Sequence, residues 1–187
     1  GMSRLPPRAT LFPYTTLFRS VDGASGRVLL ARNATALRHP ASLTKMMTLY
    51  MLFGALQRGQ VTMQTLLPIS EHAAEQSPTK MGLAPGDAIS VEDAIKSIVI
   101  HSANDIAVAI AESLGGTESN FAHLMTQKAR DLGMRNTFYH NASGLPDSAQ
   151  ITTAADLEVL ARHLAYDFPQ YLHYFSLESF RFRGRYY

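Results

Sequence analysis

The chain has 187 residues, 46% of them hydrophobic and 17% charged, which is the composition of one globular domain with a substantial core. Its net charge is only +2 and its basic residues are scattered, so it is not expected to bind nucleic acid. It has no cysteine, which excludes disulfide bonds and thiolate metal sites, and none of its apolar stretches reaches the roughly 18 residues of a membrane span.

The first 20 residues have an unusual composition. They carry three arginines and three prolines but no continuous apolar segment, so they do not form a signal peptide. Their second half, LFPYTTLFRS, resembles the in-frame translation of a sequencing-library adapter. We therefore expect residues 1–20 to be a non-native segment and residues 21–187 to form the domain. Because residues 15–22 are rich in β-forming side chains, a strand can still occupy this place.

Strand and helix signals then alternate as far as residue 90. Residues 20–33 predict a strand, a glycine-rich turn and a second strand. Residues 42–59 have helical periodicity, with Gly59 as the expected C-terminal cap. A short helix capped by Ser70 and an extended segment at 84–90 follow.

The next part of the chain is mostly helical. Ser90 and Asp93 resemble a capping box for a helix over 91–101. A second apolar helix covers 103–116 and ends at two glycines, and Thr117 caps an amphipathic helix over 118–133. After a polar loop, Thr153 caps a helix over 154–165.

The last ten residues, ESFRFRGRYY, alternate aromatic and arginine side chains, as in the first strand of a hairpin. We expect no returning strand after it.

A helical middle flanked by pieces of a β-sheet predicts an α+β fold rather than alternating βαβ units.

Ser42 and Lys45 form the first candidate site. Residues three apart on a helix share a face, about 5–6 Å apart at Cβ. A serine hydroxyl becomes a nucleophile when a base takes its proton, and burial at a helix N-terminus lowers the pKa of a lysine enough for that task. On these four residues alone, however, a capping serine and a lysine reaching to solvent are the simpler interpretation.

Ser102 and Asn104 form the second candidate site, inside the apolar run 95–112. Buried polar groups without partners are costly, so this cluster needs a reason. One interpretation is a break between helices, with Ser102 and Asn104 capping the second. The other is a cleft in which Ser102 relays a proton and Asn104 donates to a substrate carbonyl.

Together these stretches resemble the active-site motifs of penicillin-binding proteins and serine β-lactamases, in which S-x-x-K is followed at a similar spacing by S-x-N. The wider segments VDGASGRVLLARNATALRHPASLTKMMT, KMGLAPGD, SANDIAVAIAE, LGMRNTFYHNASGLPD and TTAADLEVLARHL resemble the serine D-alanyl-D-alanine carboxypeptidases, over residues 21–187. That resemblance implies that Ser42 is the acyl-enzyme nucleophile, Lys45 its general base, Ser102 a proton relay and Asn104 a substrate-binding residue. It also implies that the Ser42 backbone N–H is an oxyanion donor.

The resemblance further implies the substrate, the inhibitors and the location of the protein. The expected partner is a peptidoglycan stem peptide that loses its terminal D-alanine, β-lactam antibiotics are expected covalent inhibitors, and no metal or cofactor is needed. The location would be periplasmic or elsewhere in the cell envelope. Membrane association would come only from segments absent from this chain.

One motif of the family is missing. Its third motif, K-T-G, lies on a strand, and none of the four lysines here precedes Thr-Gly or Ser-Gly. We therefore expect a β-lactamase/DD-peptidase-like fold with a largely complete helical subdomain and an incomplete antiparallel sheet. Because the family's third-motif strand supplies the second oxyanion donor, we expect impaired activity in this fragment.

Two alternatives remain open. A class A β-lactamase would share Ser42 and Lys45 but needs a glutamate that positions the deacylating water, and no glutamate after Asn104 lies in a segment resembling that loop. A non-catalytic envelope protein that binds peptidoglycan would leave the joint presence of Ser42 and Lys45 without a purpose.

Overall fold

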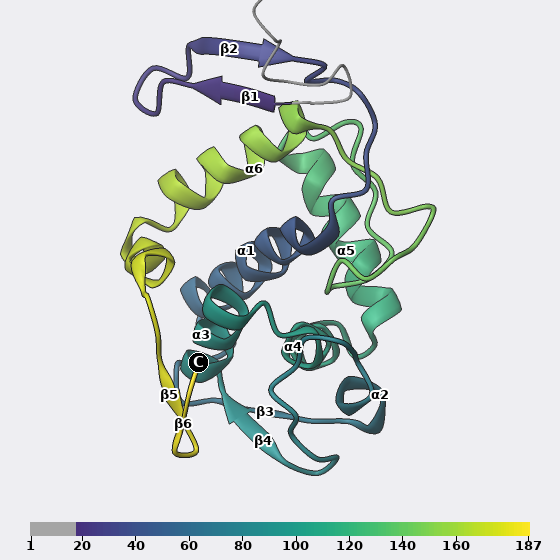
Figure 1. The fold of residues 1–187 in the computed structure, drawn as a ribbon, viewed down its shortest axis with the longest axis vertical. Helices are drawn as coiled ribbons and strands as arrows, with labels where there is room; N and C mark the ends of the chain where they lie inside the picture. Colours follow the sequence, from purple (N-terminus) through teal and green to yellow (C-terminus); the bar gives the residue numbers. More distant parts are fainter. Residues whose placement is uncertain (1–17) are drawn as a thin grey trace, which may run out of the picture.

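The computed structural model describes residues 18–187. Most of the predicted non-native segment therefore lies outside the described residues. Its last three residues belong to strand β1 (Phe18–Val21), which pairs antiparallel with β2 (Val28–Arg32). This hairpin confirms the predicted strand–turn–strand and lies across helix α6 at one end of the molecule (Figure 1).

Helix α1 (Thr44–Gln57) runs through the centre of the molecule, preceded by the 3₁₀ turn η1 (Ala41–Leu43) (Figure 1). It packs against α4, α5 and α6. Because it is covered on nearly every side, it carries no amphipathic pattern, and its large side chains such as Met47, Leu52 and Phe53 are fully buried. Gly59 follows the helix with a φ of +68°, which confirms its predicted place at the C-terminal end.

Four further helices of 11 to 14 residues follow within the described residues, and three of them begin at the predicted caps. The side chains of Ser90, Thr117 and Thr153 accept hydrogen bonds from backbone N–H groups of the first turns of α3, α5 and α6. The bounds of the four helices are α3 (Val91–His101), α4 (Asn104–Gly115), α5 (Glu118–Asp131) and α6 (Ala154–Asp167).

Helix α4 lies in the centre of the helical layer. Its residues 106–111, all apolar and mostly small, are fully buried. Small side chains let neighbouring helices approach closely, and α4 contacts α1, α2, α3 and α5. This packing fixes the N-terminal end of α4, which carries Asn104, relative to α1.

The remaining elements are short. Strand β3 (Leu66–Pro68), which the sequence did not predict, pairs antiparallel with β4 (Ala88–Ser90). Between them lies α2 (Glu71–Ala74), capped by Ser70 as predicted, and a 3₁₀ segment η2 (Pro169–Ser176) follows α6. Helices with small antiparallel sheets confirm the α+β fold.

The prediction of no returning strand at the end of the chain is wrong. Strand β5 (Arg181–Phe182) turns back at once into β6 (Arg185–Tyr186). Arg183 and Gly184 between them have φ angles of +46° and +83°. Two successive positive φ angles allow a two-residue hairpin turn, so ten residues suffice for both strands.

Within residues 18–187, no helix is long and apolar enough to cross a membrane.

Candidate active site

Ser42 lies in η1, two residues before α1 begins, and is exposed. The sequence placed it inside the helix, whereas the 3₁₀ turn runs directly into the first turn of α1. Ala41 before it has a φ of +48°, a left-handed conformation that is uncommon for a residue with a side chain. Such backbone strain concentrates at functional sites because the surrounding structure must hold it in place.

Lys45 lies in the first turn of α1 and is only 3% exposed. Its Nζ donates to Asn104 Oδ1 at 2.7 Å and to the Ser143 carbonyl oxygen at 2.6 Å. Burial lowers the pKa of Lys45 from 10.5 to about 8, because desolvation disfavours the ammonium form. A minor fraction of these side chains, roughly a tenth at pH 7, is therefore neutral and able to accept a proton.

The candidate cluster at residues 102–104 lies where α3 meets α4. Ser102 ends α3 with a φ of +54°, the second strained backbone at the site. The interpretation of Ser102 and Asn104 as caps of the second helix is wrong, since Ala103 is the N-terminal cap of α4 and no side chain caps it. The Asn104 amide instead binds Lys45 and donates from Nδ2 to the Ser77 carbonyl at 3.2 Å.

A cavity of about 500 Å³ joins the two candidate clusters. Ser42, Lys45 and Ser102 all line it, whereas Asn104 is not among its lining residues and binds Lys45. The Ser42 and Ser102 hydroxyls make no hydrogen bond to any residue in the range 18–187 and are free to meet a ligand. The rest of the wall is mainly apolar, with Met46, Leu49, Ile98, Val99 and Phe175 among its residues.

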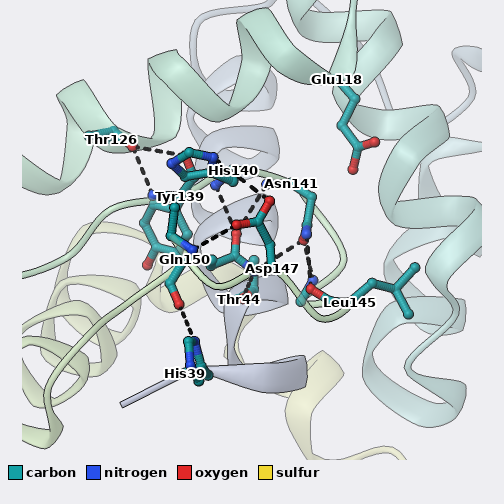
Figure 2. Close-up of polar contacts among 12 residues, drawn as sticks. His39, Thr44, Glu118, Thr126, Tyr139, His140, Asn141, Leu145, Asp147 and Gln150 are labelled. Carbon is teal, nitrogen blue, oxygen red and sulfur yellow. Dashed lines mark hydrogen bonds and ion pairs between the residues drawn. The ribbon is translucent and has the colours of Figure 1, made fainter. Parts of the chain in front are cut away.

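The predicted polar loop is part of the site, which the sequence did not reveal. We call residues 139–150 the Gln150 loop. Two of its carbonyl groups face α1, where Ser143 O accepts from Lys45 and Ala142 O accepts from Thr48 Oγ1 at 2.7 Å. Figure 2 shows the hydrogen bonds inside this loop and to its neighbours. The loop atoms that bind α1 are backbone oxygens, so no side-chain motif in the sequence predicts these contacts.

Asp105 is a second residue that sequence reasoning missed. It is fully buried beside Asn104. Its carboxylate accepts from the backbone N–H groups of Met81, Gly82 and Ile106 at 2.9–3.0 Å. Burial raises the pKa of Asp105, while the three hydrogen bonds act against that rise. Together with the bond from Asn104 N to Thr79 O, this carboxylate ties the segment 79–82 to the start of α4.

The histidines are not arranged as a metal site. Within the described part of the chain, no three His, Asp or Glu side chains gather where they could hold a metal ion. His101, which adjoins Ser102 in sequence, stacks edge-on against Tyr187 with ring centroids 5.1 Å apart. His39 binds the Gln150 carbonyl through Nδ1 at 2.8 Å. Both histidines therefore have structural contacts.

These features define what the site can do chemically. A lysine with a pKa near 8 and an unpaired serine hydroxyl share one cavity with a second free hydroxyl. Activation of a hydroxyl by a neighbouring base is the common requirement of acyl transfer through a covalent intermediate. The arrangement therefore suits hydrolysis of an amide or ester bound in the cavity.

Comparison with known proteins gives one consistent result. A family model described as D-alanyl-D-alanine carboxypeptidase matches residues 18–187. The D-alanyl-D-alanine carboxypeptidase DacF of Bacillus subtilis is 35% identical over 144 residues, which cover 77% of this chain and 37% of that protein. The chain spans about two fifths of the length of the curated relatives it matches.

Several solved structures share the fold, among them the following two. The carboxypeptidase DacD from Francisella tularensis superposes with a TM-score of 0.87 at 34% identity, over 96% of this chain and 44% of that one. Penicillin binding protein 5 from Haemophilus influenzae superposes with a TM-score of 0.88 at 30% identity, over 98% of this chain and 53% of that one.

Proposed function

Because this chain belongs to the D-alanyl-D-alanine carboxypeptidase family, we propose that its domain is a serine peptidase that removes the terminal D-alanine from peptidoglycan pentapeptides. The reaction would pass through an ester between the peptide and Ser42. The observation that carries the proposal is the lysine at the site. Lys45 is buried and has no carboxylate partner among residues 18–187, and its pKa of about 8 suits a base that works near neutral pH.

In the acylation step, neutral Lys45 would take the proton of the Ser42 hydroxyl as the oxygen attacks the carbonyl carbon. The Ser42 backbone N–H would stabilise the negative charge on the carbonyl oxygen. Collapse of this intermediate breaks the C–N bond to D-alanine. The leaving amine receives a proton from Lys45 through the Ser102 hydroxyl, and free D-alanine departs.

In the deacylation step, a water molecule would attack the ester carbonyl and transfer its proton by the same residues back to Ser42 Oγ. Asn104 would have two tasks. Its Oδ1 holds Lys45, and its Nδ2, of which one hydrogen is directed at Ser77, has a second hydrogen for a substrate carbonyl.

We extend the proposal to inhibitors and location. A β-lactam presents a reactive amide to the same hydroxyl and would leave a covalent adduct on Ser42. The structural neighbour from Haemophilus influenzae, among others, is named a penicillin binding protein. The substrate is a cell-wall polymer, so the whole protein would work in the cell envelope.

A class A β-lactamase is a weaker alternative. The glutamates after Asn104 are Glu112, Glu118, Glu158 and Glu178, and none of them lines the cavity. Glu118 instead binds Ala142 N and His72, and Glu158 lies beside Arg19 and Arg162. A carboxylate held in this way cannot position a deacylating water at Ser42.

The deciding experiment is covalent labelling by a fluorescent penicillin, with Ser42→Ala as the control. We expect a stable adduct on the wild-type chain and none on Ser42→Ala, because the nucleophile has gone. Undiminished labelling of a folded Ser42→Ala chain would refute the proposal. Rapid turnover of penicillin in place of a stable adduct would favour a β-lactamase, and binding of stem peptide without any labelling would favour a non-catalytic protein.

The rate of the 187-residue chain is a separate part of the proposal. The chain contains no K-T-G triplet, and loss of one oxyanion donor typically costs about 10²–10³ in rate. We expect D-alanine release from a pentapeptide at a rate reduced to that extent relative to a longer chain that includes the motif. Equal rates would refute this part alone.

A further inference from the structure

We propose that the Gln150 loop is a positioning element that fixes the Lys45 amine relative to the Ser42 turn, residues 41–43. In this role Gly144 lies against the turn, and the side chain of Gln150 holds the loop together through its hydrogen bonds. This inference rests on the proposed function, because it assigns these residues to the same reaction. Neither Gly144 nor Gln150 makes a hydrogen bond to Lys45 Nζ or to the Ser42 hydroxyl.

The loop contacts the N-terminal end of α1 at two backbone oxygens. Ser143 O accepts from Lys45 Nζ at 2.6 Å, and one residue earlier Ala142 O accepts from Thr48 Oγ1 at 2.7 Å. Thr48 and Lys45 lie three residues apart and share a face of the helix. Two bonds to adjacent carbonyl groups fix both the distance and the rotation of the loop relative to that face. A shift of the loop would therefore move an acceptor away from the lysine.

Gln150 braces the loop from inside. The side chain is 2% exposed. Its Oε1 accepts from the backbone N–H groups of His140 and Asn141 at 2.9 and 3.1 Å, and its Nε2 donates to Asn141 Oδ1 at 3.1 Å and to Thr44 Oγ1 at 3.4 Å. One buried amide thus joins the start of the loop to Thr44, the residue directly before Lys45 (Figure 2).

Asn141 carries this brace on to Gly144. Its Oδ1 also accepts from Gly144 N at 2.7 Å, and its Nδ2 donates to Leu145 O at 3.0 Å. Glu118 on α5 holds the same stretch from the other side by accepting from Ala142 N at 2.9 Å. The segment 141–145 is therefore fixed by side chains on both sides.

Gly144 is where the loop meets the Ser42 turn. A Cβ atom at this position would lie 1.9 Å from Ala41 O, 2.4 Å from Ala41 C and 3.0 Å from Ser42 N. The neighbouring atoms are backbone and cannot rotate away. Glycine therefore allows the loop to lie directly against the Ala41–Ser42 peptide, whose N–H is the proposed oxyanion donor.

Gly133 provides a matched control. Its φ of +89° is nearly that of Gly144, at +87°, but a Cβ atom there would meet nothing within 4 Å. Alanine costs the same backbone strain at both positions. Only Gly144→Ala adds the collision with Ala41 and Ser42. A difference between Gly144→Ala and Gly133→Ala therefore measures the contact itself.

The test reads the titration of Lys45 by ¹³C NMR of the lysine ε-carbons, which is practical because the chain has only four lysines. Displacement of the loop admits water to Lys45, so we expect Gly144→Ala to raise its pKa by about one unit or more toward 10.5. Gly133→Ala should titrate like the wild type. In the labelling assay, Gly144→Ala should react about 10²-fold more slowly with fluorescent penicillin, since a displacement of about 1 Å has effects of that size.

Gln150→Met supplies a second variant if Gly144→Ala does not fold. It keeps the approximate volume of the side chain and removes all of its hydrogen bonds, so we expect the same direction of change in the Lys45 titration. A folded Gly144→Ala or Gln150→Met chain with the wild-type titration would overturn the inference.

The two proposals fail in different ways. If the wild-type chain takes up no penicillin, the proposed function fails, while the Lys45 titrations still test the positioning. If Ser42 is labelled and Gly144→Ala is labelled equally fast with an unchanged Lys45 titration, the proposed function stands and the positioning is refuted.

Discussion

Both halves of α1 contain fully buried side chains, but these side chains differ in kind. In the first half, Thr44, Lys45 and Thr48 are no more than 3% exposed, and the side chains of all three form hydrogen bonds with atoms outside the helix. In the second half, Leu52 and Phe53 are equally buried among apolar side chains. Burial alone therefore does not distinguish the site from the core, whereas the buried polar groups and their partners do.

The difference has an energetic basis. An apolar side chain in the core stabilises the fold through removal of its surface from water and through close packing. A buried polar group contributes little net stability, but loss of its partner is costly. We therefore expect apolar truncations in the second half to lower stability without a change in the Lys45 titration, and substitutions in the first half to act through the loss of polar partners.

The largest effect on stability should come from Leu52→Ala. The side chain is fully buried, and such truncations typically cost about 2–5 kcal/mol because they leave a cavity. Urea denaturation would measure the change in the free energy of unfolding. Leu52 lies two turns beyond Lys45, so the pKa of Lys45 in the folded chain should not move. A change in that pKa as large as in Gly144→Ala would show that the two halves are coupled.

The second effect is a dependence of stability on pH. The pKa of Lys45 is about 8 in the folded chain and 10.5 in the unfolded one. Between these values the unfolded chain binds a proton that the folded chain does not, so stability rises with pH through this window. The rise is of the order of 3 kcal/mol at 1.36 kcal/mol per pKa unit. Below pH 8 both states are protonated and the cost of the buried charge is fully present.

Lys45→Met is the control for this dependence. It removes the titrating amine. The wild type should therefore become more stable relative to Lys45→Met as pH rises from 8 to 10. The comparison is needed because burial raises the pKa of Tyr139, which lowers stability at higher pH. A constant difference between the two chains would mean that Lys45 has its ordinary pKa when folded.

The smallest effect should come from Thr48→Val. This change keeps the side-chain shape and leaves Ala142 O without its donor, for which we expect a loss of about 1–3 kcal/mol. Thr62→Val is the matched control, because Thr62 is exposed and its hydroxyl binds, among residues 18–187, only the Thr65 hydroxyl. We expect this variant to change stability by less than about 0.5 kcal/mol. Equal losses in both variants would show that the contact with the Gln150 loop contributes nothing.

Much of this arrangement could be predicted from the sequence. Helix periods and caps such as Ser90, Thr117 and Thr153 are local signals, and the structure confirms them. The lowered pKa of Lys45 was also predicted, since an apolar helix start implies desolvation. The roles of Ser42, Lys45, Ser102 and Asn104 remain predictions that the labelling experiment tests.

The rest depends on contacts that leave no local pattern. Ser143 contributes a carbonyl oxygen to Lys45, an atom that every residue possesses. Asp105 binds the backbone N–H groups of Met81 and Gly82, which are more than 20 positions away in the sequence. Only the fold reveals that these residues lie close together. The returning strand β6 was missed because a turn of Arg183 and Gly184 leaves only two residues for each strand.

The contacts that close the site also bear on how the chain folds. Lys45 and Ser143 are 98 positions apart, Thr48 and Ala142 are 94, and Thr44 and Gln150 are 106. Contacts between residues so distant in sequence require the closure of long loops, which delays their formation relative to helices and local turns. The lysine is desolvated only after this closure. Reactivity at Ser42 should therefore develop after helix content and compactness during refolding, so that acylation reports the completion of folding.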